Sequence, residues 1–252
     1  MPMNDCLAQK VMGLILSGLF TWYLLPCLSL AAAVSQVGEA SSIPNTNEIA
    51  AQLTAMNAKR AAALRSYSGL RLYELDYKGL PTNKHAKMTV HVRYETPNLE
   101  FKVISMEGSK LLLNRVLLKL LQSEREDTNH DSHADTALND TNYNFVLLGD
   151  DLIAGRTCYV LEVTPKRPNK HSYTGKVWVD AEEFAVVRMK VHPFKNPSFW
   201  LTKTEIDQQY AKHGDFWLAS TNLSTSKIRL GGQAILKIEY RDYRIGLADQ
   251  GQ

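Results

Sequence analysis

Cysteine is scarce in this 252-residue chain: there are three, and only Cys158 lies beyond the first 33 residues. That part of the chain therefore has no intramolecular disulfide and must be held together by its apolar core. Cys158 has no histidine or acid at a recognisable motif spacing, so we expect a buried structural thiol and not a nucleophile. A strong charge of one sign is also lacking. The net charge of +3 is too mild to indicate nucleic-acid binding.

Catalytic signatures are absent as well. The sequence contains no nucleophile elbow, HExxH motif, phosphate-binding loop or dinucleotide fingerprint. The most suggestive cluster of metal-ligand character is formed by His130 and His133 with the aspartates beside them, within an acidic segment from Ser123 to Thr141. Because we expect no strand or helix to fix these ligands, a solvated loop is the preferred interpretation and a metal site the weak alternative. We therefore expect no enzyme, no metal and no cofactor.

One long hydrophobic run is present near the N-terminus, from Val11 to Leu30. It follows a short polar start and precedes Ala31–Ala33, the small residues that a signal peptidase prefers. We interpret residues 1–33 as a cleaved signal for export to the periplasm, residues 34–43 as a linker and residues 44–252 as one domain. A run of this length can also span a bilayer. The alternative is thus an inner-membrane anchor that leaves the domain facing the periplasm.

Beyond this run the sequence repeatedly alternates apolar and polar residues, the period of a strand with one apolar face. Apolar positions change parity near Tyr73 and between Val103 and Ile104, which predicts bulges that curl the sheet. The pattern predicts one curved antiparallel sheet with a continuous apolar face. Ten strands are expected, at about residues 67–77, 86–95, 99–107, 143–151, 156–164, 173–180, 184–194, 201–212, 215–230 and 233–245.

Two helices are expected beside this sheet. The first begins at Asn45, which has capping-box spacing with Glu48, and continues to about Ser66 as a plug on the sheet. The second, residues 109–122, is apolar over most of its circumference. It is too short to span a membrane, so it must bury itself in protein or in a ligand. We expect the polar residues 123–141 to form an exposed loop or hinge that lets this leucine-rich helix act as a lid or plug.

Aromatic residues gather in the C-terminal hairpins, at Trp178, Phe194, Phe199, Trp200 and Trp217. They fit an ordinary core, and they fit equally the rim of an apolar opening, where wide rings meet acyl chains and water together. The sequence alone leaves both interpretations open.

The second half of the chain contains a series of strand–turn segments: Gly155–Pro165, Tyr173–Asp180, Phe184–Arg188, Asn196–Trp200, Gly214–Leu218 and Ile238–Tyr243. Together these segments resemble the LolA-like outer-membrane lipoprotein-sorting proteins of bacteria. The resemblance implies a mainly β, α+β fold: a half-open β-barrel that is lidded or filled by helices and shields acyl chains during transfer across the periplasm. The arginine that LolA-like carriers have on a helix has two candidates here, Arg60 and Arg65.

The predicted function is therefore that of a periplasmic carrier, which binds acyl chains of lipoproteins or other lipids in an apolar cavity for transfer towards the outer membrane. A lipid-sensing or protein-interaction module of envelope signalling is the alternative. A monomer is expected, with lipids and the inner- and outer-membrane lipoprotein-transfer proteins as partners. The expected lipid-binding residues lie on strand faces, on the leucine-rich helix and in the aromatic hairpins: Met88, Val90, Val92, Leu112, Val116, Leu117, Leu120, Trp178, Met189, Phe199, Trp200 and Trp217.

Overall fold

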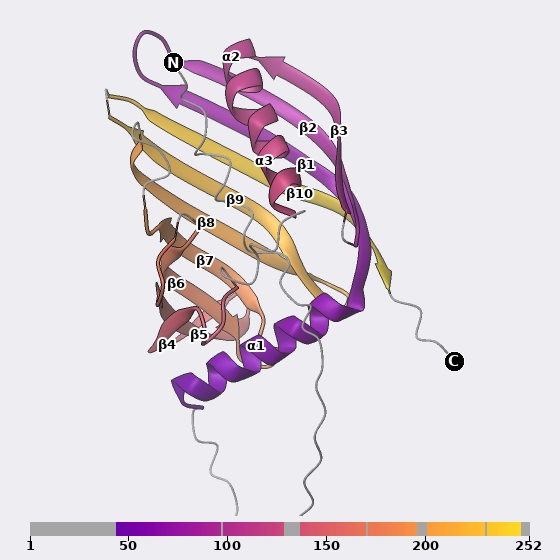
Figure 1. Cartoon of the computed structure of the whole chain (residues 1–252), viewed down its shortest axis with the longest axis vertical. Helices are drawn as coiled ribbons and strands as arrows, with labels where there is room; N and C mark the ends of the chain where they lie inside the picture. The colour runs from indigo at the N-terminus through magenta and orange to yellow at the C-terminus, as the bar shows by residue number, and fades with distance from the viewer. Residues whose placement is uncertain are drawn as a thin grey trace, which may run out of the picture.

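The computed structural model describes residues 44–96, 98–128, 137–169, 171–195, 201–229 and 231–247. These residues form one antiparallel sheet of ten strands with helices on its concave side (Figure 1). The helices are α1 (Thr46–Ala63) and a continuous segment made of α2 (Lys110–Leu112), the π-helical turn η1 (Leu113–Leu117) and α3 (Leu118–Thr128). The strands are β1 (Leu64–Lys78), β2 (Lys84–Glu95), β3 (Asn98–Gly108), β4 (Tyr143–Ile153), β5 (Arg156–Pro165), β6 (Tyr173–Asp180), β7 (Val186–Pro193), β8 (Leu201–His213), β9 (Phe216–Ile228) and β10 (Gln233–Leu247).

The strand order explains why the sheet stays open. It runs β3-β2-β1-β10-β9-β8-β7-β6-β5-β4, so β1 and β10 pair in the middle of the sheet. The two edges are β3 and β4, which do not pair with each other. The chain passes from one edge to the other through the helical segment that follows β3 (Figure 1). The predicted mainly β, half-open architecture is confirmed.

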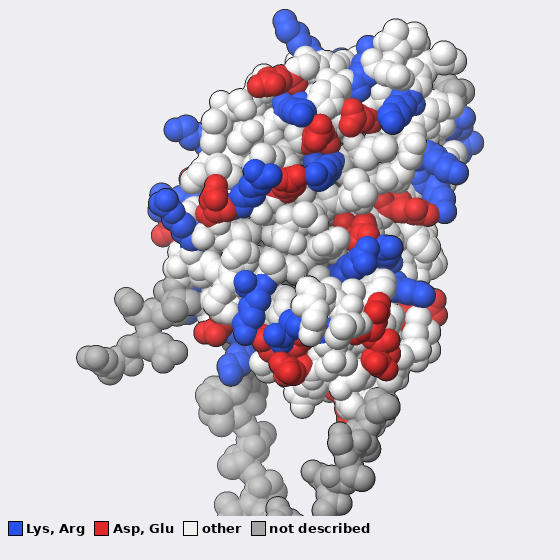
Figure 2. Space-filling view, turned by 180° about the vertical axis from the view of Figure 1, so that it is seen from behind, with Lys and Arg blue, Asp and Glu red and all other residues white. Residues whose placement is uncertain are grey.

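Alternating burial confirms the strand pattern that the sequence predicts. On β2, Ala86, Met88, Val90, Val92 and Tyr94 are all at most 5% exposed, while the residues between them are polar and more exposed. Burial of each large apolar side chain contributes about 1.5–3 kcal/mol to stability. Figure 2 shows the convex face from behind, where basic and acidic side chains are interspersed. The concave face is thus apolar and the convex face charged.

One of the two predicted bulges lies where the sequence places it. In the pairing of β2 with β3, Thr89 faces Ser105 and Val90 faces Val103, so Ile104 is an extra residue in β3. An extra residue of this kind bends the strand and increases its twist. The bulge therefore helps the β1–β3 end of the sheet to curl over its helix.

The bulge predicted near Tyr73 is wrong. Residues Tyr67, Arg71, Tyr73 and Leu75 lie on the buried side of β1 without any change of parity, because Arg71 occupies an inner position. The irregularity lies instead on the partner strand β10, where Asp242 adopts a φ of 56° opposite the backbone of β1. The sequence pattern misplaces the bulge because it assigns a charged side chain to the solvent face.

Helix α1 begins with the predicted capping box. The Asn45 side chain accepts a hydrogen bond from the Glu48 amide at 3.0 Å, and the Glu48 side chain accepts one from the Asn45 amide at 3.0 Å. Ile49 and Leu53 on its inner side are fully buried against the concave face of the β4–β8 half. The helix ends at Ala63, earlier than predicted, and the chain continues directly into β1. The expected plug is therefore present in this half.

The leucine-rich helix covers the other half of the sheet and is longer than predicted. It begins at Lys110 and continues to Thr128, so the first residues of the segment expected to be a loop are helical. Its buried leucines pack in one cluster with the inner face of β1–β3, β9 and β10. Each half of the concave face thus has its own helix and its own apolar cluster (Figure 1).

Within the described ranges no helix is long and apolar enough to cross a membrane. The expected signal and linker, residues 1–43, lie outside those ranges, as do His130, His133, Phe199 and Trp200. The expectations for these residues remain predictions.

Candidate functional site

Seven of the predicted lipid-binding residues lie together where the leucine-rich helix packs against the sheet. Met88, Val90 and Val92 point inward from β2, at most 1% exposed, because residues two apart share one face of a strand. The four predicted side chains of the helix belong to the same cluster, and of these Leu117 is fully buried and Val116 is half-buried. The helix residues concerned are Leu112, Val116, Leu117 and Leu120.

Met189 lies on the concave face as well, but in the cluster beneath α1. A strip of buried polar side chains on β8 and β9 lies between the two apolar clusters, and these residues form hydrogen bonds both between the two strands and along β9. Gln208 accepts a hydrogen bond from Asn222 at 2.9 Å, and Asn222 accepts one from Ser224 at 2.9 Å. The sequence analysis missed this strip, although the polar residues at three alternate positions, Asn222, Ser224 and Ser226, are a signal for it.

The tryptophans of the described hairpins do not join this site. Trp178 lies between the inward-facing Val177 and Val179 and therefore points to the convex face, where it packs with Cys158 and Val187. Its indole N–H donates to a carboxylate oxygen of Asp151 at 2.9 Å. The tryptophan is thus held by contacts on the far side of the sheet from the concave clusters.

Trp217 is placed in the same way, between Phe216 and Leu218 on the inner face, and its indole donates to Glu183 at 2.9 Å. Cys158 is fully buried beside these rings, and burial raises the pKa of its thiol to about 11. A thiol with so high a pKa is a poor nucleophile at neutral pH.

A buried ion pair is a second feature of the concave face that the sequence analysis missed. Arg71 on β1 contacts the carboxylate of Glu124 on α3, and each side chain is only 6% exposed. The guanidinium lies 3.5 Å from the Tyr73 hydroxyl oxygen. It also lies 5.5 Å from the ring centroid of Phe101 and 5.2 Å from that of Tyr240. The ion pair therefore connects the sheet to the helix that covers it.

Electrostatics keep this pair charged. Burial acts to lower the pKa of Arg71, but the negative charge of Glu124 holds that pKa well above its ordinary value. Removing one partner of a buried pair is strongly unfavourable, because the other charge is then left without compensation in a medium of low polarity. If the helix leaves the sheet, Arg71 loses the compensating charge of Glu124, which is equally unfavourable unless another group compensates the guanidinium.

Arg60, one of the two arginines considered for the family's helix position, has a different role. It donates from the last turn of α1 to the backbone carbonyls of Glu183 and Phe184, the latter at 3.3 Å. It thereby fastens α1 to the turn between β6 and β7. Arg65 is exposed at the start of β1.

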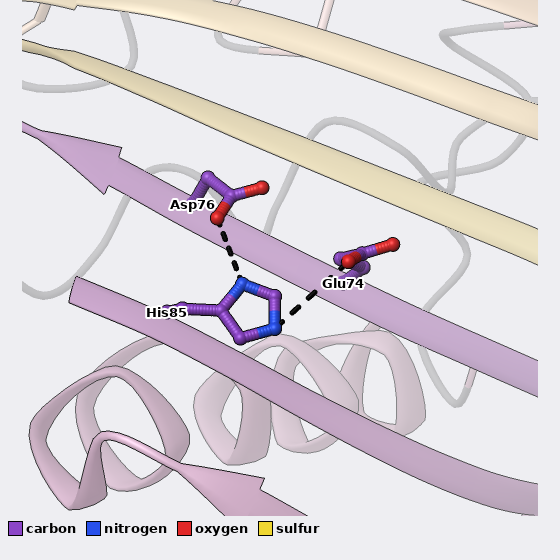
Figure 3. Close-up of side chains that lie close together, drawn as sticks. All are labelled: Glu74, Asp76 and His85. Carbon is purple, nitrogen blue, oxygen red and sulfur yellow. Dashed lines mark hydrogen bonds and ion pairs between the residues drawn. The ribbon is translucent and has the colours of Figure 1, made fainter.

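A second cluster, on the convex side of β1 and β2, has metal-ligand residue types: Glu74, Asp76 and His85 (Figure 3). The His85 ring lies between the two carboxylates, with Nδ1 2.7 Å from Asp76 and Nε2 3.9 Å from Glu74. The ammonium of Lys87 is 3.2 Å from the same Glu74 oxygen. Because each ring nitrogen faces its own carboxylate and a lysine already contacts one of them, the arrangement is a surface ion-pair network and does not fit a single metal ion.

Comparison with known proteins places the chain among structures of related shape. No curated protein matches the sequence. A putative outer membrane lipoprotein-sorting protein domain from Vibrio parahaemolyticus is 16% identical, with 82% of this chain and 93% of that chain covered and a TM-score of 0.44. A DUF1329 family protein from Desulfovibrio piger is 13% identical, with 82% and 92% covered and a TM-score of 0.41. A LolA superfamily protein from Nitrosomonas europaea is 12% identical, with 81% and 94% covered and a TM-score of 0.39.

A lipoprotein-sorting protein domain and a LolA superfamily protein are among the solved structures to which this chain is similar. A family model also matches residues 125–250, which are half of the chain and include all strands from β4 to β10. The family is described only as "Uncharacterized protein", and the chain belongs to that family.

Proposed function

We propose that this protein binds acyl chains of lipids or lipoproteins on the concave face of the β1–β3 half, beneath the helical segment α2–η1–α3. In this proposal it carries them through the periplasm towards the outer membrane. Binding and release are the whole activity, and no covalent bond is made or broken. Residues 1–33 supply the export signal, residues 34–43 are a linker, and the domain that begins at residue 44 binds the lipid.

One observation carries the proposal: an apolar sheet face is covered by a single helical segment and not by a second sheet. The inward-pointing side chains of Met88, Val90 and Val92 form an apolar wall, and the buried leucines of the helix cover it. Displacement of the cover would open a trough whose apolar wall is already built. Each methylene group buried there contributes about 0.8 kcal/mol, so part of an acyl chain is enough to replace the contacts of several leucines.

The residues proposed for the trough are those that meet in this cluster, on β2 and on the helix. Met189 lies beneath α1 and contributes only if the ligand extends into that half. Trp178 and Trp217 are on the convex side and are left out of the trough. Phe199 and Trp200 are retained from the sequence analysis as proposed rim residues.

The first test is whether the gently purified protein carries or binds lipid. Native mass spectrometry should detect a co-purified acyl lipid, and monolaurin, a neutral amphiphile, should bind to the stripped protein. Absence of both would overturn the proposal.

A pair of variants on the cover makes the test site-specific. Leu117→Ala removes a fully buried contact of the cover and should tighten monolaurin binding, because the helix is then easier to displace. Leu111→Ala is the matched control on the same helical segment, since Leu111 is 50% exposed and should leave binding unchanged. Equal effects of the two variants would place the ligand elsewhere.

A further inference from the structure

The buried Arg71–Glu124 pair assigns a chemical class to the ligand. Building on the function proposed above, we infer that the site takes an acyl chain whose head carries an anionic group, a carboxylate or a phosphate. The anionic group of the ligand replaces the Glu124 carboxylate on Arg71 when the helix is displaced.

The first step of the argument is the position of Arg71. Its side chain points from β1 into the apolar cluster that forms the proposed trough, between the rings of Phe101 and Tyr240. A guanidinium offers five N–H donors in a planar fork that matches a carboxylate or phosphate, and it remains charged at every physiological pH. A permanent anion-binding group therefore lies inside the site.

The second step is what happens to this charge on opening. Glu124 is carried by α3, so a displaced helix takes the carboxylate away from Arg71. A neutral head group would leave the guanidinium uncompensated among apolar side chains, whereas an anionic head group restores the pair. Glu124 thus occupies the closed site in the manner of a ligand carboxylate.

The third step concerns the hydroxyl groups around the guanidinium. Tyr67, Tyr73 and Tyr240 lie on the same inner face, and burial raises the pKa of each, so they stay protonated. A protonated hydroxyl can donate a hydrogen bond to an anion that reaches Arg71. The surroundings of the guanidinium are therefore suited to an anionic head and not to a cationic one.

The test compares ligands that share one acyl chain and differ in the head: laurate, dodecyl phosphate and monolaurin. Titration calorimetry on the wild-type protein should give laurate or dodecyl phosphate an affinity about tenfold or more above that of monolaurin, as expected for a charge-assisted bond. Preference between the two anions tells whether a fatty acid or a phosphate-bearing lipid is the better source of the anionic group.

Two variants test whether the preference for an anionic head depends on the Arg71–Glu124 pair. Glu124→Gln removes the carboxylate that holds the closed helix to Arg71, so laurate and monolaurin should both bind about tenfold or more tightly, while the preference for laurate is kept. Arg71→Met combined with Glu124→Leu replaces both charges by apolar side chains, which avoids a lone buried charge and preserves folding. This double variant should still bind monolaurin but should lose the preference for the anion.

The outcomes separate this inference from the proposed function. Binding of neither anionic nor neutral ligands would overturn the proposed function itself. Equal affinity for laurate and monolaurin in the wild type, or an anion preference that survives in the double variant, would overturn the inference and leave acyl binding intact.

Discussion

The Arg71–Glu124 pair gives a sharp prediction for stability. Arg71→Met removes the guanidinium charge that compensates the buried Glu124 carboxylate, and Glu124→Gln removes the negative charge that compensates the Arg71 guanidinium. Because both side chains are 6% exposed, solvent cannot compensate either charge in the closed protein. Each single variant should therefore lower the free energy of unfolding by about 3–5 kcal/mol, the range for breaking a buried pair. That is a large fraction of the roughly 5–15 kcal/mol by which domains are stable.

The matched control is the double variant Arg71→Met with Glu124→Leu. Replacing a buried pair by apolar side chains is often neutral or stabilising, so this variant should unfold near the wild-type midpoint. In urea, the single variants should unfold at a midpoint lower by roughly 1–2 M, given a slope of about 2–3 kcal/mol per molar for a domain of this size.

The assay is urea unfolding followed by tryptophan fluorescence, combined with hydrogen exchange of α3. Faster exchange confined to α3 would mean that the lone charge is relieved by local release of the helix, and the global loss is then smaller. The reasoning would be refuted if both single variants lost less than about 1 kcal/mol of unfolding free energy without release of α3, because a solvent-exposed ion pair contributes no more than that.

Three further predictions concern α1 and the charged turn beneath it. Leu53→Ala should lower the free energy of unfolding in urea by about 2–5 kcal/mol, because Leu53 is fully buried. Gln52→Ala, at an exposed neighbouring position, should change it little. Arg60→Gln should speed hydrogen exchange in the last turn of α1, because the bonds to the carbonyls of Glu183 and Phe184 are lost; unchanged exchange would contradict this anchoring. Burial acts to raise the pKa of Asp180, but hydrogen bonds from Arg156 and nearby amides hold that pKa below its ordinary value. The ionised carboxylate therefore stabilises the folded protein above about pH 4, and this stabilisation is lost as the pH falls through the lower pKa of the folded state. The melting temperature of Asp180→Asn should therefore change less than that of the wild type between pH 5 and pH 2.

Local pattern predicted much of the fold. Strict alternation at residues 86–94 identified β2 and its buried face, and the described part of the chain contains the ten strands that were expected. The capping box at Asn45 located the start of α1. Such features depend on neighbours within a few residues, which the sequence displays directly.

The site was only partly predictable, because its deciding contact is not local. Arg71 and Glu124 are 53 residues apart and belong to different elements. Taken alone, Arg71 looks like a solvent-facing residue, and this produced the misplaced bulge. Glu124 looks like the start of a polar loop, although it follows Leu117, Leu120 and Leu121 at helical spacing on the buried side.

The tryptophans illustrate a different limit. Clustering in the sequence fitted a shared apolar opening as well as an ordinary core, but alternation along β6 and β9 turns Trp178 and Trp217 to the convex face. Their neighbours Val177 and Leu218 face inward instead. Strand parity, applied to these hairpins residue by residue, would have predicted the placement.

The central claim is that lipid binds beneath the leucine-rich helix and displaces it. Hydrogen exchange of the wild-type protein with and without bound monolaurin tests this directly. We predict faster exchange of amides in the helical segment 110–125 when lipid is bound, with α1 unchanged. Bound lipid that leaves this segment as protected as before, or that changes only α1, would contradict the account.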